Sequence, residues 1–224
     1  MNGEYPIYYN AKIRKNTLNW NDPAWEKAKI ASIDHFHPAG SSHHPQTETK
    51  IAYNHEGIFV LFRVKDRYVR SVYTEYNTKV HEDSCVEWFF QPPGAEGYYN
   101  FEINAGGTLH VNYIIDPERD ENGKRKNIRP VPAGIAKKIL IESSLPAIVD
   151  PEIESEIEWR LAVFIPLSFF DHYTPLGNIT GAVARGNLYK CGDKTSHPHW
   201  AAWNPIDVLN FHRPDCFGSF VFIE

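Results

Sequence analysis

Two glutamates, Glu87 and Glu102, occupy equivalent places in two stretches separated by a segment rich in proline and glycine. Apolar and polar residues alternate in both stretches, which predicts a β-hairpin with one buried face. If Trp88 pairs with Phe101, Glu87 lies directly opposite Glu102. Opposed carboxylates on neighbouring strands repel each other. Such a pair is easier to keep where an arginine, a metal ion or a ligand's hydroxyl groups neutralise it. The alternatives are that both glutamates are solvated on an outer face, or that the two strands pair in a different register.

Further polar and aromatic candidates occur near this hairpin or late in the chain. Asn104 extends the polar face of the second strand, and Arg185 and Asn187 share one face of a predicted strand at 179–189. Residues 197–217 pack three histidines, two tryptophans and three prolines into one predicted loop. Binding residues concentrate in loops of this kind when a rigid scaffold carries them. From this loop we select three candidates: Trp203, Phe211 and His212.

These residue types suit a sugar, which has an apolar face of C–H groups and a rim of hydroxyls. Aromatic side chains can cover the face, and charged groups form the stronger hydrogen bonds with the rim. The same inventory is also found in an ordinary aromatic core with a few surface ion pairs. The first hypothesis is non-catalytic binding of a mono- or oligosaccharide end.

The alternative is a glycoside hydrolase in which Glu87 and Glu102 act as the acid and base. Cβ atoms of opposed residues on paired strands lie about 4.5–5.5 Å apart. Retaining glycosidases need their two carboxyl groups about 5–5.5 Å apart. The spacing therefore allows this chemistry without demanding it.

The predicted scaffold is an all-β antiparallel sandwich or jelly-roll with one or two short helical turns, because short alternating segments recur and no long helical pattern is present. Without a repeat or linker, we expect one domain over residues 1–224. Residues 116–129 are charged and are expected to form an exposed loop. A short helix is expected at 23–28, with Trp20 and Trp25 in the core. Besides the central hairpin, we expect strands at 5–13 (an edge strand), 49–53, 58–64, 108–115, 139–143, 157–165, 179–189 and 217–223.

Composition narrows the choice of partners. The chain has 224 residues, a net charge of −5 and no long basic run, which argues against nucleic acid as the main partner. No apolar stretch is long enough for a membrane span. The first residues lack the pattern of a signal peptide, so we expect a cytoplasmic protein or an exported one whose leader has been removed. Three cysteines at unrelated spacings predict reduced, mostly buried thiols. Residues 35–45 contain four histidines, but the loop shows no metal-ligand spacing.

The chain resembles carbohydrate-binding module family 9, within the wider DOMON-like β-sandwich superfamily, from about Trp20 to the end. The resemblance implies a β-sandwich that binds a sugar without catalysis. It also implies a structural calcium ion, although no carboxylate spacing marks its ligands. Some DOMON-like relatives bind haem through methionine and histidine, but the only methionine here is Met1. The segments that carry the resemblance are NDPAW (Asn21–Trp25), VKDRYVRS (Val64–Ser71), HEDSCVEWFFQP (His81–Pro92), YYNFEINAGG (Tyr98–Gly107) and NFHRPDCFGSFVF (Asn210–Phe222).

The same resemblance assigns roles to particular positions. Two aromatic side chains of the family sandwich a terminal sugar, and their places fall on His81 and Phe211. The family's hydroxyl-binding glutamate falls on Glu87, and a basic residue expected on the next strand falls on Glu102. His81 and Glu102 therefore depart from the family pattern. These departures imply a different ligand, a site moved towards Trp203 and Arg185, or loss of binding.

Overall fold

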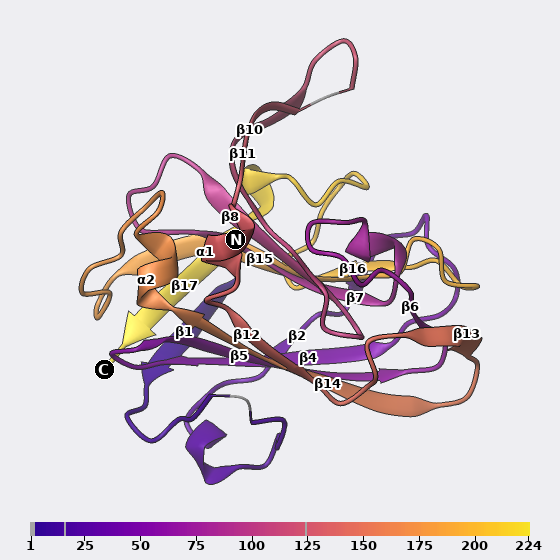
Figure 1. Ribbon diagram of the computed structural model, residues 1–224, viewed down its shortest axis with the longest axis horizontal. Helices are drawn as coiled ribbons and strands as arrows, with labels where there is room; N and C mark the ends of the chain where they lie inside the picture. The colour runs from indigo at the N-terminus through magenta and orange to yellow at the C-terminus, as the bar shows by residue number, and fades with distance from the viewer. Residues whose placement is uncertain (1–2, 16, 124) are drawn as a thin grey trace.

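The computed structural model describes residues 3–15, 17–123 and 125–224, which form a strand-rich molecule with little helix (Figure 1). The strands are β1 (Glu4–Tyr9), β2 (Ala31–Ser32), β3 (His35–Phe36), β4 (Gln46–Tyr53), β5 (Gly57–Asp66), β6 (Val69–Ser71), β7 (Cys85–Gln91), β8 (Tyr98–Asn104), β9 (Leu109–His110), β10 (Asn112–Arg119), β11 (Arg125–Pro130), β12 (Leu140–Ser143), β13 (Val149–Ile153), β14 (Ile157–Pro166), β15 (Val183–Cys191), β16 (Trp200–Ala202) and β17 (Gly218–Ile223). The helical turns are η1 (Pro23–Trp25), η2 (Val80–Glu82), α1 (Ala133–Ala136), α2 (Leu167–Phe170) and η3 (Pro214–Cys216).

Hydrogen-bonded strands run in the order β11-β10-β8-β7-β15-β17-β1-β4-β5-β14-β12. The path folds back on itself, so that β8, β7 and β15 form one layer over β4, β5 and β14 in the other (Figure 1). The predicted all-β sandwich is therefore confirmed, as is the hairpin of β4 and β5. In the described part of the chain, no helix is long and apolar enough to cross a membrane.

Strand β1 joins the two layers. It pairs in parallel with β17 over residues 4–8 and with β4 at Tyr8 and Tyr9. The prediction of an edge strand was therefore wrong. Tyr5 and Ile7 are buried because they pack in the main core, and so short a segment gives little sign in its sequence that β1 has a neighbour on each side.

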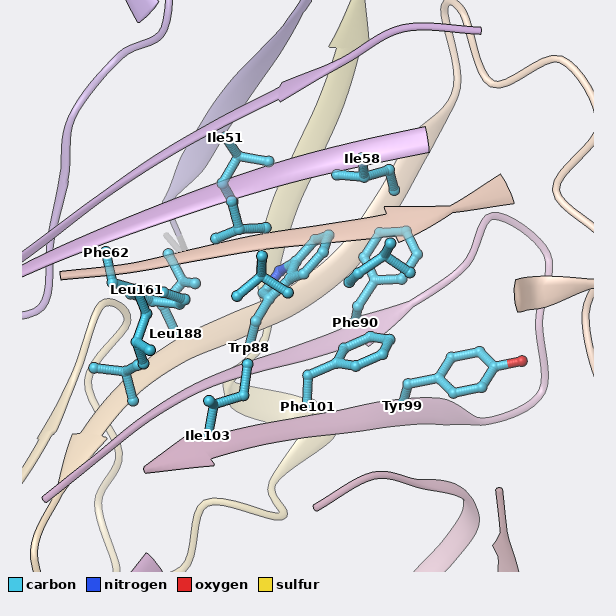
Figure 2. Packing of buried hydrophobic residues seen from close by; sticks show 14 of the residues in the cluster. Ile51, Ile58, Phe62, Trp88, Phe90, Tyr99, Phe101, Ile103, Leu161 and Leu188 are labelled. Carbon is cyan, nitrogen blue, oxygen red and sulfur yellow. The ribbon is translucent and has the colours of Figure 1, made fainter. Parts of the chain in front are cut away.

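The main core lies between the layers. Figure 2 shows Trp88, Phe90 and Phe101 from β7 and β8 close to Ile51 and Ile58 from β4 and β5. Burying a large apolar side chain contributes about 1.5–3 kcal/mol, so this cluster of aromatics fixes which faces of β7 and β8 point inward. The expected core residues Trp20 and Trp25 are also buried, in a smaller cluster on the outer face of the other layer.

The central hairpin has the predicted register. Trp88 pairs with Phe101, and Glu87 pairs with Glu102. Since the aromatic side chains occupy the core, both glutamates lie on the outer face of the layer. That face is itself covered, and Glu87 and Glu102 are only 2% and 6% exposed. The alternative of two solvated glutamates is therefore wrong.

Residues 116–129 differ from the expected loop. They form most of a β10–β11 hairpin, which projects from the top of the molecule in Figure 1. The arms pair Asp116 with Asn127 and Arg119 with Arg125. This stretch has polar residues on both faces, so it lacks the apolar alternation from which strands are predicted.

Candidate functional site

A pocket of about 500 Å³ lies over the outer faces of β7, β8 and β15. Glu87, Glu102 and Cys191 contribute to it from three adjacent strands. Segments far apart in the sequence complete it: η2, the β10–β11 hairpin, and the long stretch between β15 and β17. The sandwich thus supplies a rigid base, and the connections supply the walls.

The two glutamates have different hydrogen-bond partners. Glu102 Oε1 accepts from Asn100 Nδ2 at 2.7 Å, and Oε2 lies 3.8 Å from His81 Nδ1. Glu87 Oε1 accepts from the Cys191 thiol at 3.2 Å. The pocket therefore places two buried carboxyl groups side by side, with acceptor capacity left for a donor-rich ligand.

Burial raises the pKa of Glu87 well above its usual range, and the nearby Cys191 and Glu102 raise it further. A third acid, Asp193, also has a raised pKa because of burial, although its bond from Trp200 opposes the shift. These shifts follow from the low polarity of the site and the proximity of like charges. A ligand that donates hydrogen bonds would relieve both.

Two aromatic side chains in the pocket are held by specific contacts. The Phe211 ring stacks on Tyr189, with 4.1 Å between centroids and an interplanar angle of 9°. The Tyr189 hydroxyl donates to the Phe211 carbonyl at 2.8 Å, which fixes the same segment. On another wall, Trp200 Nε1 donates to Asp193 Oδ1 at 2.7 Å. The pocket thus has flat apolar surfaces beside its carboxyl groups.

The remaining wall is polar. Asn100 Oδ1 accepts from the Asn112 backbone N–H at 2.8 Å, and Asn112 Nδ2 contacts His110 Nε2 at the same distance. Arg119 and Ile128 reach the pocket from the β10–β11 hairpin. The hairpin that the sequence did not predict therefore contributes to the site.

Five of the nine predicted ligand-binding residues line this pocket. Glu87 and Glu102 form its carboxyl pair, His81 approaches from η2, and Phe211 and His212 come from the segment before β17. His212 Nδ1 lies 2.8 Å from the Tyr98 hydroxyl, which positions its ring. The convergence expected of three distant parts of the chain is present for these residues.

Two predicted asparagines have structural partners instead. Asn104 Nδ2 donates to the Tyr73 carbonyl and to Asp83, and its Oδ1 accepts from the Thr108 backbone. Asn187 bridges β15 to the backbone of Asn204. Both are fully buried, so their placement in the ligand site was not supported. Alternation along a strand gave their face, but it did not show that neighbouring backbone groups use these amides.

Arg185 and Trp203 also lie outside the pocket lining. Arg185 is exposed and donates to the Pro214 carbonyl at 2.7 Å. Trp203 packs against Tyr5 and Phe220, with ring centroids at 6.3 and 5.3 Å. The expected convergence of these two on the glutamates is therefore wrong, and Trp200 is the tryptophan of this loop that faces the pocket.

Several lining residues were not selected from the sequence: Asn100, His110, Asn112, Arg119, Cys191, Asp193 and Trp200. Asn100 could have been chosen, since it shares the face of Glu102 two residues away. The others depend on long-range packing that a single sequence does not reveal.

Among residues 3–15, 17–123 and 125–224, no side-chain cluster matches the predicted calcium ion. In the described part of the chain, the group of three potential metal ligands that lies close together is Cys85, Glu87 and Cys191. Calcium binds six to eight oxygen atoms, so two thiols do not suit it. The buried Asp66 pairs with Lys190 and the buried Asp83 with Arg70, which leaves both with protein cations. Calcium therefore stays a prediction.

The histidine-rich segment at 35–45 forms specific contacts. His43 Nε2 lies 2.7 Å from Asp66 Oδ1, and His44 stacks on Phe36 at 4.1 Å between centroids. These partners give the two histidines hydrogen-bonding and packing roles.

The family of the chain follows from comparison with known proteins. The sequence model that describes carbohydrate-binding family 9 matches residues 22–222. Among solved structures, a proposed carbohydrate-binding protein from Bacteroides uniformis ATCC 8492 is 28% identical with a TM-score of 0.85, over 99% of this chain and 100% of the other. A search of curated proteins finds no match.

A family 9 carbohydrate-binding module from Caldicellulosiruptor kristjanssonii is also similar. Its complex with glucose has a TM-score of 0.64 and 12% identity, over 98% of this chain and 95% of that one. Its complex with cellotriose has a TM-score of 0.61 and 11% identity, over 99% and 94%. At this identity the likeness shows a common fold. Because the family model spans nearly the whole chain, the protein belongs to carbohydrate-binding family 9.

Proposed function

We propose that the protein binds the end of a mono- or oligosaccharide in the pocket over β7, β8 and β15. Family membership supports carbohydrate binding. The observation that carries the proposal is the buried carboxyl pair, Glu87 and Glu102, held side by side in a pocket that also contains a stacked aromatic ring.

Each group has a distinct part in this proposal. The Phe211 ring, fixed by Tyr189, covers the C–H face of the sugar. Glu87 and Glu102 accept hydrogen bonds from neighbouring hydroxyls, and Asn112 can add an amide. His81, next to Glu102, takes the place of the family's second aromatic side chain. The contacts are charge-assisted on the rim and apolar on the face, which gives orientation as well as affinity.

The first ligands to test are glucose and cellotriose, which the Caldicellulosiruptor module binds in its solved complexes. The acidic lining of this pocket favours sugars whose polar groups donate hydrogen bonds. A sugar carrying a carboxylate would meet Glu87, Glu102 and Asp193 at close range, and like charges disfavour one another in a buried site. We therefore expect neutral sugars to bind more tightly than uronic acids.

Isothermal titration calorimetry with a panel of soluble sugars tests the proposal. Losing a hydrogen bond costs about 0.5–1.5 kcal/mol, so Glu87→Gln should weaken the tightest ligand roughly 2- to 12-fold. Phe211→Ala should weaken it through loss of the stacked surface. Arg185→Ala is the matched control, because Arg185 is exposed and lies outside the pocket lining. Absence of binding across the panel, or wild-type affinity in Glu87→Gln, would overturn the proposal.

A glycoside hydrolase is the second candidate, because the predicted register of the two glutamates is present. Opposed residues in this register have Cβ atoms about 4.5–5.5 Å apart, which is compatible with a retaining mechanism. Hydrolysis of aryl-glycosides that Glu102→Gln abolishes would favour the enzyme. Binding without hydrolysis would favour the module.

A further inference from the structure

We propose that Cys85, Glu87 and Cys191 form a binding site for a zinc-class divalent metal ion at the base of the pocket. In these three residues, two sulfur atoms and one carboxylate oxygen all lie within 4.8 Å of one another. The proposal concerns a metal ion and does not depend on which sugar, if any, the pocket binds.

The strand register explains why these side chains meet. Cys85 and Glu87 are two residues apart on β7, so they lie on the same face. Cys191 lies directly opposite Cys85 on the neighbouring strand β15. The Cys191 sulfur also contacts Glu87 Oε1 at 3.2 Å. The cluster therefore rests on paired strands, which hold it more rigidly than loops would.

The donor set selects the class of metal. Two thiolates and a carboxylate suit Zn²⁺ or Co²⁺, whereas Ca²⁺ and Mg²⁺ prefer oxygen donors alone. Zinc–sulfur bonds of about 2.3 Å in a tetrahedral site place two sulfurs about 3.8 Å apart. Since the ligand atoms already lie within 4.8 Å of one another, side-chain adjustments of about 1 Å would close the site.

The charge around Glu87 favours a cation. Glu87 is 2% exposed, and the groups that act on its carboxyl most strongly, Cys191, Glu102 and Asp193, all raise its pKa and are acidic themselves. A buried carboxylate without a positive partner is costly. A divalent ion would add positive charge to that of Lys190, whose Nζ donates to the Cys191 carbonyl at 3.0 Å, and the two thiol protons would leave to solvent as the thiolates bind.

The site would keep one position open. Glu87 and Cys191 line the pocket, whereas Cys85 lies beneath it, packed with Val80 and Tyr73. Three protein ligands with a fourth position facing solvent is the arrangement of zinc sites that take up an exogenous ligand. The ion would therefore lie where a pocket ligand could reach it through an oxygen atom.

Cobalt titration of the full chain under a phosphine reductant tests the site. Wild-type protein should bind one Co²⁺ with near-ultraviolet sulfur-to-metal charge-transfer bands and the visible bands of a tetrahedral ion, and Zn²⁺ should displace it. Cys85→Ser and Cys191→Ser should each lose the charge-transfer bands and bind roughly 100-fold more weakly. Cys216→Ser is the matched control, because Cys216 is the third free cysteine and lies outside the cluster.

A measurement on wild-type protein covers the case in which a serine variant fails to fold. X-ray absorption of the zinc-loaded chain should show two sulfur neighbours at about 2.3 Å. A shell of nitrogen and oxygen alone would overturn the proposal, because it would place the ion on surface histidines or carboxylates. So would the absence of thiolate bands, or wild-type binding by Cys85→Ser. Failure of sugar binding with the thiolate signature retained would contradict the proposed carbohydrate role and leave the metal site standing.

Discussion

Lys190 is a fully buried lysine on β15, and replacing it tests how the interior holds its charges. Its side chain lies on the opposite face of β15 from Cys191 and points into the core. The Lys190 Nζ atom lies 3.5 Å from Asp66 Oδ2 and 2.7 Å from His199 Nε2, and it donates to the Cys191 carbonyl at 3.0 Å. Both Lys190 and Asp66 have side chains with no solvent exposure. Lys190→Met would keep the apolar stem and remove the charge.

The expected loss follows from the partners left behind. After the substitution, Asp66 keeps His43 at 2.7 Å, a longer contact from Trp159 Nε1 at 3.4 Å and the Arg67 backbone N–H. Its ion pair with Lys190 is gone. Breaking a buried pair on one side costs about 3–5 kcal/mol. For a chain of this size, that corresponds to a fall in melting temperature of about 6–20 °C.

Urea denaturation followed by tryptophan fluorescence and circular dichroism measures this loss. The matched control is Lys126→Met, because the Lys126 side chain is 47% exposed and its partner Glu118 is 70% exposed. Surface pairs are worth about 0–1 kcal/mol, so this variant should unfold close to wild type. If Lys190→Met lies within about 1 kcal/mol of wild type, the buried pair does not act as described.

Two further predictions concern the pH dependence of stability and a close backbone contact. Burial, aided by a nearby lysine, lowers the pKa of His199 to about 3, whereas an unfolded histidine takes up its proton near pH 6.5. The unfolding free energy should therefore fall as the pH drops from about 6.5 towards 3, by up to about 1.4 kcal/mol per pH unit from this residue. Urea titrations at several pH values should show a shallower dependence of this free energy on pH in His199→Gln but not in the control His55→Gln. Equal slopes in both variants would contradict the assignment. A Cβ atom at Gly186 would lie 2.0 Å from the Phe89 carbonyl oxygen on the paired strand β7, so Gly186→Ala should cost about 1–3 kcal/mol. At Gly134 a Cβ atom would meet nothing within 4 Å, so Gly134→Ala should melt at or slightly above the wild-type temperature, and a similar loss in both variants would refute the steric explanation.

The central hairpin was predictable because its pattern is local. Apolar and polar residues alternate in both strands, and a single register pairs Trp88 with Phe101. A shift by one residue would turn these aromatics out of the core, so the register of Glu87 and Glu102 followed from hydrophobicity alone. The sandwich was predictable for the same reason, since each strand carries its own periodicity.

The rest of the site depends on contacts between distant segments. Trp200 and Trp203 are three residues apart in one loop, and nothing local decides which of them faces the pocket. Asp193 binds the Trp200 indole, whereas Trp203 meets Tyr5 from the other end of the chain. Arg119 reaches the pocket because β10 continues into a charged hairpin beside it. Such choices are made by tertiary packing, which sequence periodicity does not encode.

The most direct test of the carbohydrate site is an NMR titration of the tryptophan indole N–H signals with cellotriose. The chain has six tryptophans, and Trp200 lines the pocket while Trp203 packs in the core. The account predicts a saturable shift of the Trp200 signal with the Trp203 signal unchanged, and a Trp200 response in Glu87→Gln that saturates only at a higher cellotriose concentration. A saturable shift centred on Trp203, or a Trp200 shift that persists unchanged in Glu87→Gln, would contradict it.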